Sequence, residues 1–518
     1  MLEANQILLL VTLVAPTVGA IAAATLPAEG DRAARILATV AAGVAFVASV
    51  LLLLSRSTQA LVDPVPSYPY GIVVSPWVEL DLPWVPGLDL RFHIGVDGIS
   101  YPLVVLTTLL TLLCALYTCW RVPDSGGGPV RGRHLAALLL VIELGIVGVF
   151  LALDLVLFFV FFEVVLLPMY AVIAIWGGER RRHAARKFVL YTLLGSLLLL
   201  VGVFTVVASA GTADLVALST AAGPAMPYGV QLAAFILLAL AFAVKSPLWP
   251  LHTWLPDAHT EAPTVGSVIL AGVLLKMGTY GLLRVAVGVA PAGAEAVAPV
   301  LGVLAVMAIL VGGLVCLAQT DLKRLIAYSS VGHMGFVLLG IATLTSVGFQ
   351  AALIGNIAHG IITGLLFFLA GAIKDRAHTG ALGELGGLRE TAPGLSGLLG
   401  YAAIASLGLP GLAGFWGEAF AVVAAFSRGG PFWIVLGVLA AVGAALAAAY
   451  FMRMLRQVTH GPPSPAVSSL TPARLAGAEV WSWAPLVVLA LVLGLVPALV
   501  TELSAVPVEA LIGVVGSP

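Results

Sequence analysis

Two lysines lie where a charged side chain is most expensive. Lys245 stands in the apolar stretch LAAFILLALAFAVKSPLWPL, and Lys276 stands in APTVGSVILAGVLLKMGTYGLL. A lysine at the centre of a bilayer costs roughly 2.5–3.5 kcal/mol on insertion scales. Unlike arginine, lysine can release its proton when it is desolvated. The two positions therefore predict a membrane site that moves protons or binds an ion.

Glu163 is the expected partner of Lys245, because it has the opposite charge and lies at a similar depth in LVLFFVFFEVVLLPMYAVIAIW. An approach of the two groups to about 4–6 Å would keep the lysine protonated, whereas separation would release the proton. The pair is therefore expected to act as a two-state proton switch. A static, structural ion pair is the alternative.

His333, His359 and Glu418 extend this set into the second half of the chain. All three lie in apolar stretches, and with Lys276 they form a row of exchangeable groups. Histidine titrates near neutral pH and suits a proton shuttle, although a single membrane histidine is equally often a packed, hydrogen-bonded residue. Glu418 either collects the proton at the end of the row or caps an interrupted helix. Glu143 is a further acid, with three open roles: proton input, structural partner, or contact to a neighbouring subunit.

A polar segment after Lys245 contains His252, Asp257, His259 and Glu261. These are metal-ligating residue types, but their spacing matches no zinc pattern. Capping of the loop, or proton entry at the inner surface, is the better interpretation.

Cysteines and glycines give no sign of a redox or nucleotide site. Cys114, Cys119 and Cys316 lie in apolar stretches without haem or cluster spacing. No phosphate-binding loop or nucleotide fingerprint stands out among the 57 glycines. We therefore expect no cofactor and no metal in this chain, and energy for transport from partner subunits or an ion gradient.

The composition predicts an all-α polytopic membrane protein. Hydrophobic residues make up 61% of the 518 and charged residues 9%, with a mean hydropathy of +1.11. The net charge of −1 argues against nucleic acid as a partner. Fourteen stretches are long enough to span a bilayer, at 4–26, 33–54, 98–120, 134–153, 154–177, 187–210, 229–250, 262–288, 297–318, 324–344, 349–373, 393–426, 431–455 and 481–503. The connection 55–97 is expected to be an ordered loop outside the membrane.

Basic residues predict the orientation of these spans. With the N-terminus outside, the inward connections hold 18 lysines and arginines and the outward connections hold four. This asymmetry favours both termini outside, because an even number of spans returns the chain to its starting side.

Two spans contain helix-breaking residues. Pro247, Pro250 and Pro256 follow Lys245, and Pro410 stands between glycines shortly before Glu418. Proline removes a backbone donor and clashes with the preceding turn. The seventh and twelfth helices are therefore expected to be discontinuous. Corresponding interruptions five spans apart indicate internal repeats of opposite topology.

Several segments between about 90 and 420 resemble the antiporter-like subunits of respiratory complex I. They are FHIGVDGISYPLVVLTTLLTLL, FFEVVLLPMYAVIAIWGG, FAVKSPLWPLHTWLPDAHTEAPTVGSVILAGVLLKMGTYGLLR, DLKRLIAYSSVGHMGFVLLG and GLPGLAGFWGE. Within that family, FEVVLLPMY with KFVLYTLLGS is most similar to the M type of bacterial NADH–quinone oxidoreductase.

The resemblance implies fourteen helices with two inverted five-helix repeats. It divides the chain into 1–133 (helices one to three and the loop), 134–288 (first repeat), 289–459 (second repeat) and 460–518 (last helix). The family's functional residues map onto Glu163, Lys245, Lys276, His333, His359 and Glu418.

The resemblance further implies a proton-translocating subunit of an NADH:quinone oxidoreductase in a bacterial plasma membrane. NADH, FMN, iron–sulfur clusters and quinone would belong to partner subunits, and other membrane subunits of complex I would be neighbours. A subunit of a multisubunit Na⁺/H⁺ antiporter or of a membrane-bound hydrogenase is the alternative. A stand-alone secondary transporter or a structural anchor fits the row of titratable residues less well.

Overall fold

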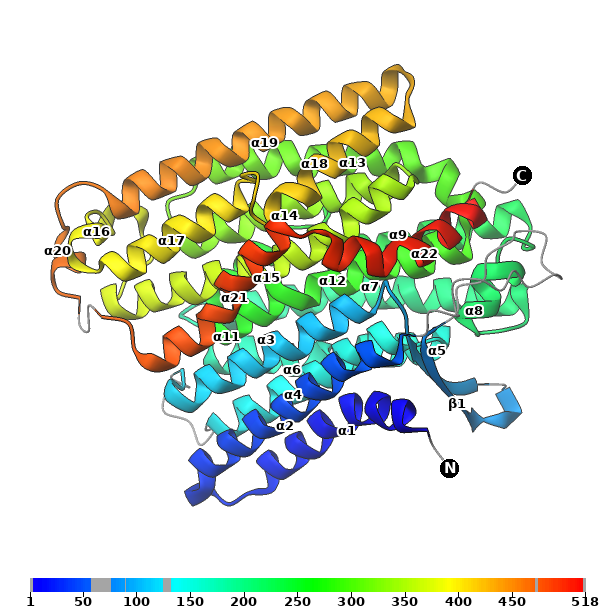
Figure 1. The fold of residues 1–518 in the computed structure, drawn as a ribbon, viewed down its shortest axis with the longest axis horizontal. Coiled ribbons are helices and arrows are strands. Elements are labelled where there is room, and N and C mark those ends of the chain that lie inside the picture. The colour runs from blue at the N-terminus through cyan, green and yellow to red at the C-terminus, as the bar shows by residue number, and fades with distance from the viewer. Residues whose placement is uncertain (1–2, 57–75, 89, 124–131, 471–473, 516–518) are drawn as a thin grey trace.

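The computed structural model of the chain describes residues 3–56, 76–88, 90–123, 132–470 and 474–515. Its long helices run side by side, so that the molecule has two ends where the connections gather (Figure 1). Fourteen helical stretches in this part of the chain are long and apolar enough to cross a membrane. This finding confirms the predicted all-helical membrane architecture.

The helices of the first part of the chain are α1 (Ala4–Thr25), η1 (Ala28–Gly30), α2 (Asp31–Leu51), η2 (Leu52–Ser55), η4 (Pro86–Leu88), α3 (Tyr101–Trp120), α4 (Gly132–Leu151), α5 (Leu155–Val164), α6 (Leu166–Trp176), α7 (Arg181–Ala210), α8 (Leu215–Ala217), the π-helical turn η5 (Leu218–Ala222) and α9 (Tyr228–Lys245). Asp154 accepts hydrogen bonds from the backbone N–H groups at the start of α5. This cap confirms the predicted boundary between the fourth and fifth spans.

The helices of the second part are α10 (Trp254–Glu261), α11 (Thr264–Ile269), the π-helical turn η6 (Leu270–Leu274), α12 (Leu275–Gly281), the π-helical turn η7 (Leu282–Val287), α13 (Pro291–Ala318), α14 (Leu322–Ala342), α15 (Ser346–Ala377), η8 (Leu382–Glu384), α16 (Leu388–Thr391), α17 (Pro393–Ser406), α18 (Gly414–Arg428), α19 (Gly430–Thr459), α20 (Pro465–Ser468), α21 (Gly477–Leu495) and α22 (Ala498–Val515).

Both predicted interruptions are present. The chain leaves helical geometry after Lys245 and resumes it at α10, and it is again interrupted between α17 and α18. The limits predicted for the last span, 481–503, were wrong. Two helices, α21 and α22, occupy this region and are separated at Pro497, which has no N–H group to continue the helical ladder.

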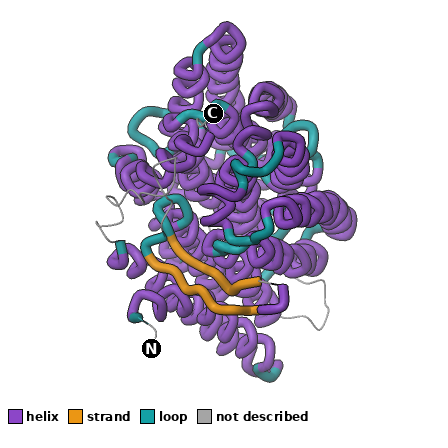
Figure 2. The backbone as a smooth tube through the Cα atoms, turned by 90° about the vertical axis from the view of Figure 1, so that its right-hand side faces the viewer, coloured by secondary structure: helices purple, strands orange, loops and turns teal. Residues whose placement is uncertain are grey.

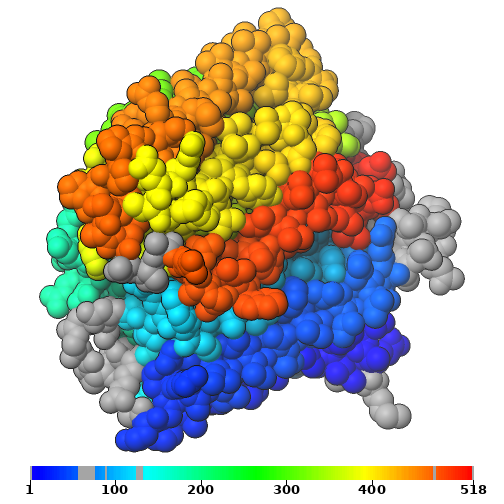
Figure 3. All heavy atoms as spheres, turned by 60° about the vertical axis from the view of Figure 1, so that its left-hand side comes forward, coloured from blue at the N-terminus to red at the C-terminus, as the bar shows by residue number. Residues whose placement is uncertain are grey.

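The centre of the bundle is formed by the stretch from α11 to η7, which is completely buried, and by α15, which is buried except near its two ends. In contrast, α7 and α19 are largely exposed, with leucines and valines on the outer face as expected for a surface in contact with lipid. Figure 3 shows α21 lying between α17 and the N-terminal helices on one face of the molecule. The centre therefore holds the helices that carry Lys276 and His359.

A short β-hairpin, absent from the prediction, covers one end of the bundle (Figure 2). Its strands β1 (Val78–Val85) and β2 (Leu90–Val96) are antiparallel, with Val78 opposite Val96. His93 hydrogen-bonds to Asp214 at 2.9 Å and to Glu79 at 3.2 Å. These bonds tie the hairpin to the connection after α7. The first part of the predicted loop, 57–75, lies outside the described residues.

The helix α1 begins, and α22 ends, at the same end of the bundle as the hairpin (Figure 1). A buried ion pair between Arg284 and Asp97, 2.9 Å apart, lies at this end too and joins η7 to the segment before α3. The opposite end holds a second buried pair, between Arg376 and Glu479, which joins α15 to α21 with a distance of 2.7 Å.

The residue before α5 and the residue before α14 form the same kind of backbone pairing. Asp154 forms an antiparallel bridge with Asp214, and Asp321 forms one with Ala381. In both cases the partner follows by 60 positions, and in both cases the aspartate accepts a hydrogen bond at the start of the next helix. Five crossings separate the two aspartates, so the pairings lie at opposite ends of the bundle.

Candidate functional site

Lys276 is completely buried in α12, between the two π-helical turns η6 and η7. A π-helical turn shifts the backbone pairing, and such turns often occur at functional sites. The ammonium donates to the carbonyl oxygen of Ala271 at 2.5 Å and lies 2.7 Å from Nδ1 of His359. No carboxylate forms an ion pair with Lys276 in the described part of the chain. Its charge is thus stabilised only by a carbonyl and an imidazole.

His359 stands in the middle of α15 and uses only one of its two ring nitrogens. Because an ammonium can only donate, Nδ1 must accept from Lys276, and the neutral ring then carries its proton on Nε2. That Nε2 atom is buried and has no hydrogen-bond partner in the part of the chain that the structure describes. Thr279, one turn after Lys276, donates to the side chain of Asn356 at 2.9 Å and thereby joins the same two helices.

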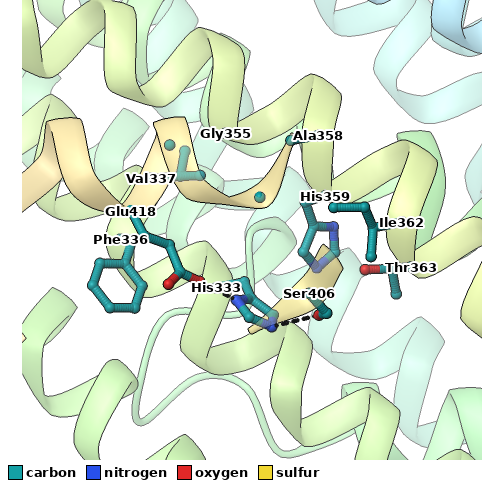
Figure 4. A pocket seen from close by; sticks show the side chains of 12 residues that line it. His333, Phe336, Val337, Gly355, Ala358, His359, Ile362, Thr363, Ser406 and Glu418 are labelled. Atoms are coloured by element: carbon teal, nitrogen blue, oxygen red, sulfur yellow. Dashed lines mark hydrogen bonds and ion pairs between the residues drawn. The ribbon is translucent and has the colours of Figure 1, made fainter. Parts of the chain in front are cut away.

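His333 is held through both ring nitrogens (Figure 4). Nδ1 lies 2.7 Å from Oε1 of Glu418, and Nε2 lies 3.0 Å from the hydroxyl of Ser406. The hydroxyl of Tyr450 is farther from Nε2, at 3.5 Å. A carboxylate can only accept, so the neutral ring carries its proton on Nδ1 and accepts the Ser406 hydroxyl proton on Nε2.

A small cavity lies beside the two histidines. Their ring centroids are 5.9 Å apart, and both rings line the cavity together with Ser406, Thr363 and Glu418. Its volume of about 30 Å³ exceeds the roughly 10–15 Å³ that a water molecule needs. The cavity can therefore hold a water molecule next to both histidines.

The interruption of the twelfth span brings Ser406 and Glu418 to the same ring. Gly408 and Gly411 have positive φ angles of 78° and 93°, which glycine adopts without strain. After this turn, Gly414 packs directly on the carbonyl oxygen of Ala405. The end of α17 and the start of α18 are thus adjacent, and each contributes one partner of His333.

Glu163 and Lys245 form a separate group in the first half. No hydrogen bond or ion pair joins them among the described residues, and Oε1 of Glu163 is buried without a partner. The ammonium of Lys245 instead lies 4.7 Å from the centroid of the Phe162 ring, within the range of a cation–π contact. The structure therefore shows the two charged groups near each other but unpaired.

Local backbone features accompany these residues as well. Lys245 is the last residue of α9, so its position follows from the predicted break. The helical ladder after Glu163 is interrupted between α5 and α6, because Pro168 has no N–H group to donate. A Cβ on Gly278 would lie 2.7 Å from the backbone of Ser246, so α12 packs directly against the end of α9.

Glu143 is fully buried in α4, and neither of its carboxylate oxygens has a hydrogen-bond partner in the described residues. A buried carboxyl without a partner is costly.

The polar segment after Lys245 divides into two groups. Asp257 pairs with Lys187 at 2.7 Å, and Glu261 accepts from the backbone N–H of Arg180 at 2.9 Å, at the end of the bundle opposite the hairpin. His259 is fully buried and stacks on Phe367, and neither of its ring nitrogens has a hydrogen-bond partner within the described ranges. The complete burial of this histidine is not apparent from the polar residues around it in the sequence.

The structure thus brings four predicted residues into one group: Lys276, His359, His333 and Glu418. Glu163 and Lys245 form the second group, and Glu143 stands alone. Sequence reasoning missed Ser406 and Tyr450. The position of Ser406 immediately before the glycine–proline break was the available signal.

Comparisons with known proteins identify the family to which the chain belongs. A family model described as NADH:quinone oxidoreductase/Mrp antiporter, transmembrane, matches residues 152–443. NADH-quinone oxidoreductase subunit M of Rhodobacter capsulatus is 41% identical over 485 residues, which cover 91% of this chain and 89% of that protein. NAD(P)H-quinone oxidoreductase chain 4 of Synechococcus sp. (strain JA-3-3Ab) is 43% identical over 385 residues, with coverages of 74% and 72%.

Solved structures show the same fold. A chain of respiratory complex I from Thermus thermophilus superimposes with a TM-score of 0.82 at 31% identity, covering 98% of this chain and 100% of that chain. A chain of the Mrp complex from Dietzia sp. DQ12-45-1b gives a TM-score of 0.81 at 24% identity, covering 99% and 52%. This chain belongs to the NADH:quinone oxidoreductase/Mrp antiporter family of membrane proteins, and within it stands with subunit M of respiratory complex I.

Proposed function

We propose that this chain translocates protons as a membrane subunit of an NADH:quinone oxidoreductase. Its relatives are subunits of such enzymes. The redox chemistry of NADH, FMN, iron–sulfur clusters and quinone would take place in partner subunits and drive transport here. The observation that carries the proposal is the row from Lys276 to Glu418, whose hydrogen bonds are nearly continuous through the buried centre of the bundle.

The row is suited to protons because each of its members can gain or lose one. Lys276 donates toward His359, and His333 donates toward Glu418. Burial makes a permanent charge on any of these groups costly, which favours passing a proton on over retaining it. A site that bound a larger solute would need a larger cavity than the one beside the histidines.

Glu163 and Lys245 serve as the switch in this proposal. Their unpaired arrangement corresponds to the state in which Lys245 is ready to release its proton. Pairing of the two groups would hold the proton on Lys245. A movement at the interruption after Lys245 would change their distance.

We further infer that residues 134–288 and 289–459 are inverted repeats. The two backbone bridges at Asp154 and Asp321 support this inference. In both, the partner residue follows 60 positions later and the aspartate caps the next helix, but the two bridges lie at opposite ends of the bundle. The 18-to-4 distribution of basic residues supports placing the end with the hairpin and both termini on the outside of a bacterial plasma membrane.

Lys276→Met tests the proposal. Methionine has a similar length and no titratable group, so proton uptake driven by NADH oxidation should fall in vesicles that contain the assembled complex. Lys187→Met is the matched control, because Lys187 pairs with Asp257 near the bundle end and should matter little. Pumping by Lys276→Met at the control level would contradict the proposal.

A subunit of a Na⁺/H⁺ antiporter is the second candidate, because the family model includes Mrp antiporters. Co-purification separates the two candidates. A complex that oxidises NADH should accompany the chain under the first proposal, and no such activity should accompany it under the second.

A further inference from the structure

We propose that the hydroxyl of Ser406 is a member of the proton path and connects the cavity beside His359 to His333. This inference rests on the proposed function and adds to it a residue and a water site. Ser406 is the last residue of α17 and lies 3.0 Å from Nε2 of His333. In Figure 4 its side chain points toward His333, on the side of that ring away from Glu418.

The first argument is the unused nitrogen of His359. Its Nε2 atom is buried and has no partner among the described residues, although it carries the proton that Nδ1 cannot hold while Lys276 donates. A buried N–H group without an acceptor is rare in folded proteins. The adjoining cavity has room for a water molecule, which would accept this proton.

The second argument is the direction of the hydrogen bonds. Glu418 can only accept, so His333 donates from Nδ1 and must accept at Nε2. Ser406 supplies the donor at Nε2, and its oxygen remains free to accept from water in the cavity that it lines. Thr363 is the other hydroxyl on the cavity wall and has no hydrogen bond to either histidine.

These bonds give one balanced sequence of proton transfers. Lys276 passes a proton to Nδ1 of His359, whose Nε2 proton moves to the water. The water passes a proton to the Ser406 oxygen, which releases its own proton to Nε2 of His333. The Nδ1 proton of His333 moves to Glu418. Lys276 loses one proton, Glu418 gains one, and every group between them keeps its proton count.

The position of Ser406 also links the path to the break in the helix. Ser406 belongs to α17 and Glu418 to α18, so the two partners of His333 come from opposite sides of the interruption. A small movement at this break would lengthen one of the two hydrogen bonds of His333 and so interrupt the proton path. The break thereby becomes a point at which the path can be interrupted.

Ser406→Ala in the assembled complex is the central test. NADH-driven proton uptake into vesicles should fall about tenfold, less than the roughly hundredfold that a positioned acid or base contributes, because a second water enters the space. Ser406→Cys keeps a transferable proton and should lie between alanine and the wild type. Ser330→Ala is the matched control, since Ser330 is a buried serine near His333 whose hydroxyl donates to its own backbone at 3.2 Å.

The solvent isotope effect separates proton transfer from a structural role. In Ser406→Ala the uptake rate should become more sensitive to D₂O, because proton transfer through the altered path becomes limiting. A loss of uptake with an unchanged isotope effect would overturn the inference, as would uptake at the Ser330→Ala level.

Lys276→Met and Glu418→Gln, measured in parallel, distinguish this inference from the proposed function. If both lose uptake while Ser406→Ala retains it, only the role of Ser406 is wrong. If all three retain uptake, the proposed path itself is wrong.

Discussion

The two interrupted helices hold their titratable residues in different ways. Around the second interruption, Glu418 and Ser406 form hydrogen bonds to the two ring nitrogens of His333. Around the first, the ammonium of Lys245 lies over the face of Phe162, and Oε1 of Glu163 is buried without a hydrogen-bond partner among the described residues. The titratable residues around the second interruption are joined by hydrogen bonds, and we call this the connected region. Those around the first interruption are not joined by hydrogen bonds among the described residues.

This difference indicates a division of labour. A group with hydrogen bonds on both sides, such as His333, can pass a proton at fixed distances, so its region is suited to conduction. A buried pair without a hydrogen bond can change its proton occupancy by moving, so its region is suited to gating.

Removal of the Lys245 ammonium should have the largest effect. Lys245→Ala should abolish most NADH-driven proton uptake, by at least about tenfold, while the complex still assembles. Lys245→Arg should fail nearly as completely, because arginine keeps its charge and does not release a proton. The measurement is proton uptake by vesicles together with the amount of assembled complex.

Lys187→Ala is the control for these variants, since Lys187 makes a partly exposed ion pair near a bundle end. Normal uptake by Lys245→Arg would show that charge alone suffices at this position, and the switch would have to be abandoned.

Glu418→Gln should reduce uptake strongly in the connected region. Glutamine can still accept the hydrogen bond from Nδ1 of His333, but it cannot take up the proton. If Glu418 only caps the interrupted helix, Glu418→Gln should cause no loss of proton uptake, because glutamine retains the hydrogen-bond geometry. Glu390→Gln, at an exposed position, should behave as the wild type in the same uptake assay. Wild-type uptake by Glu418→Gln would remove Glu418 from the path.

The sequence predicted the spans, the two breaks and the members of the row, because hydropathy, proline and isolated charges are local signals. Contacts such as His333 with Glu418 join residues on different helices and depend on how those helices rotate and tilt. For the same reason the lack of a Glu163–Lys245 ion pair could not be foreseen. The π-helical turns around Lys276 carry no proline, so they left no mark in the sequence. The β-hairpin was missed because its strands are short and flanked by prolines.

Glu163 variants test whether the unpaired arrangement is functional. Glu163→Gln should lower uptake, and Glu163→Asp should retain part of it, because aspartate keeps the charge at a shorter reach. In combination with Lys245→Ala, Glu163→Gln should cause little further loss, since groups that titrate as a pair lose their function together. Uptake rates of the four combinations form the double-mutant cycle. Strictly additive losses would show that the two residues act independently.

Gly417→Ala should have a moderate effect on the connected region. A Cβ at this position would lie 2.5 Å from the Cα atom of Gly355, so α18 could no longer pack closely against α15. Overpacking of this kind typically destabilises by about 1–3 kcal/mol. Less assembled complex should be recovered, and it should unfold at a lower temperature. Gly397→Ala in α17 is the control, because a Cβ there would meet nothing within 4 Å. Equal melting temperatures for the two variants would show that the packing tolerates the methyl group.

The smallest expected effect concerns the hairpin, outside both regions. Burial alone lowers the pKa of His93, but hydrogen bonds to the carboxylates of Asp214 and Glu79 outweigh it and raise that pKa above 6.5. For Asp214, burial raises the pKa, but the hydrogen bonds from His93 and from the backbone of Ala217 bring it below 3.8.

A raised histidine pKa stabilises the folded state below the unfolded value of 6.5, and this stability is lost as the pH rises through the folded pKa. The lowered pKa of Asp214 adds stability above 3.8, which is lost as the pH falls through its folded value. Amide hydrogen exchange in β2, corrected for the intrinsic rate, should therefore become faster between mildly acidic and mildly alkaline pH. His93→Gln should flatten this dependence and leave proton uptake unchanged, because the hairpin contacts neither group of titratable residues. A pH dependence that persists in His93→Gln would place its origin elsewhere in the loop.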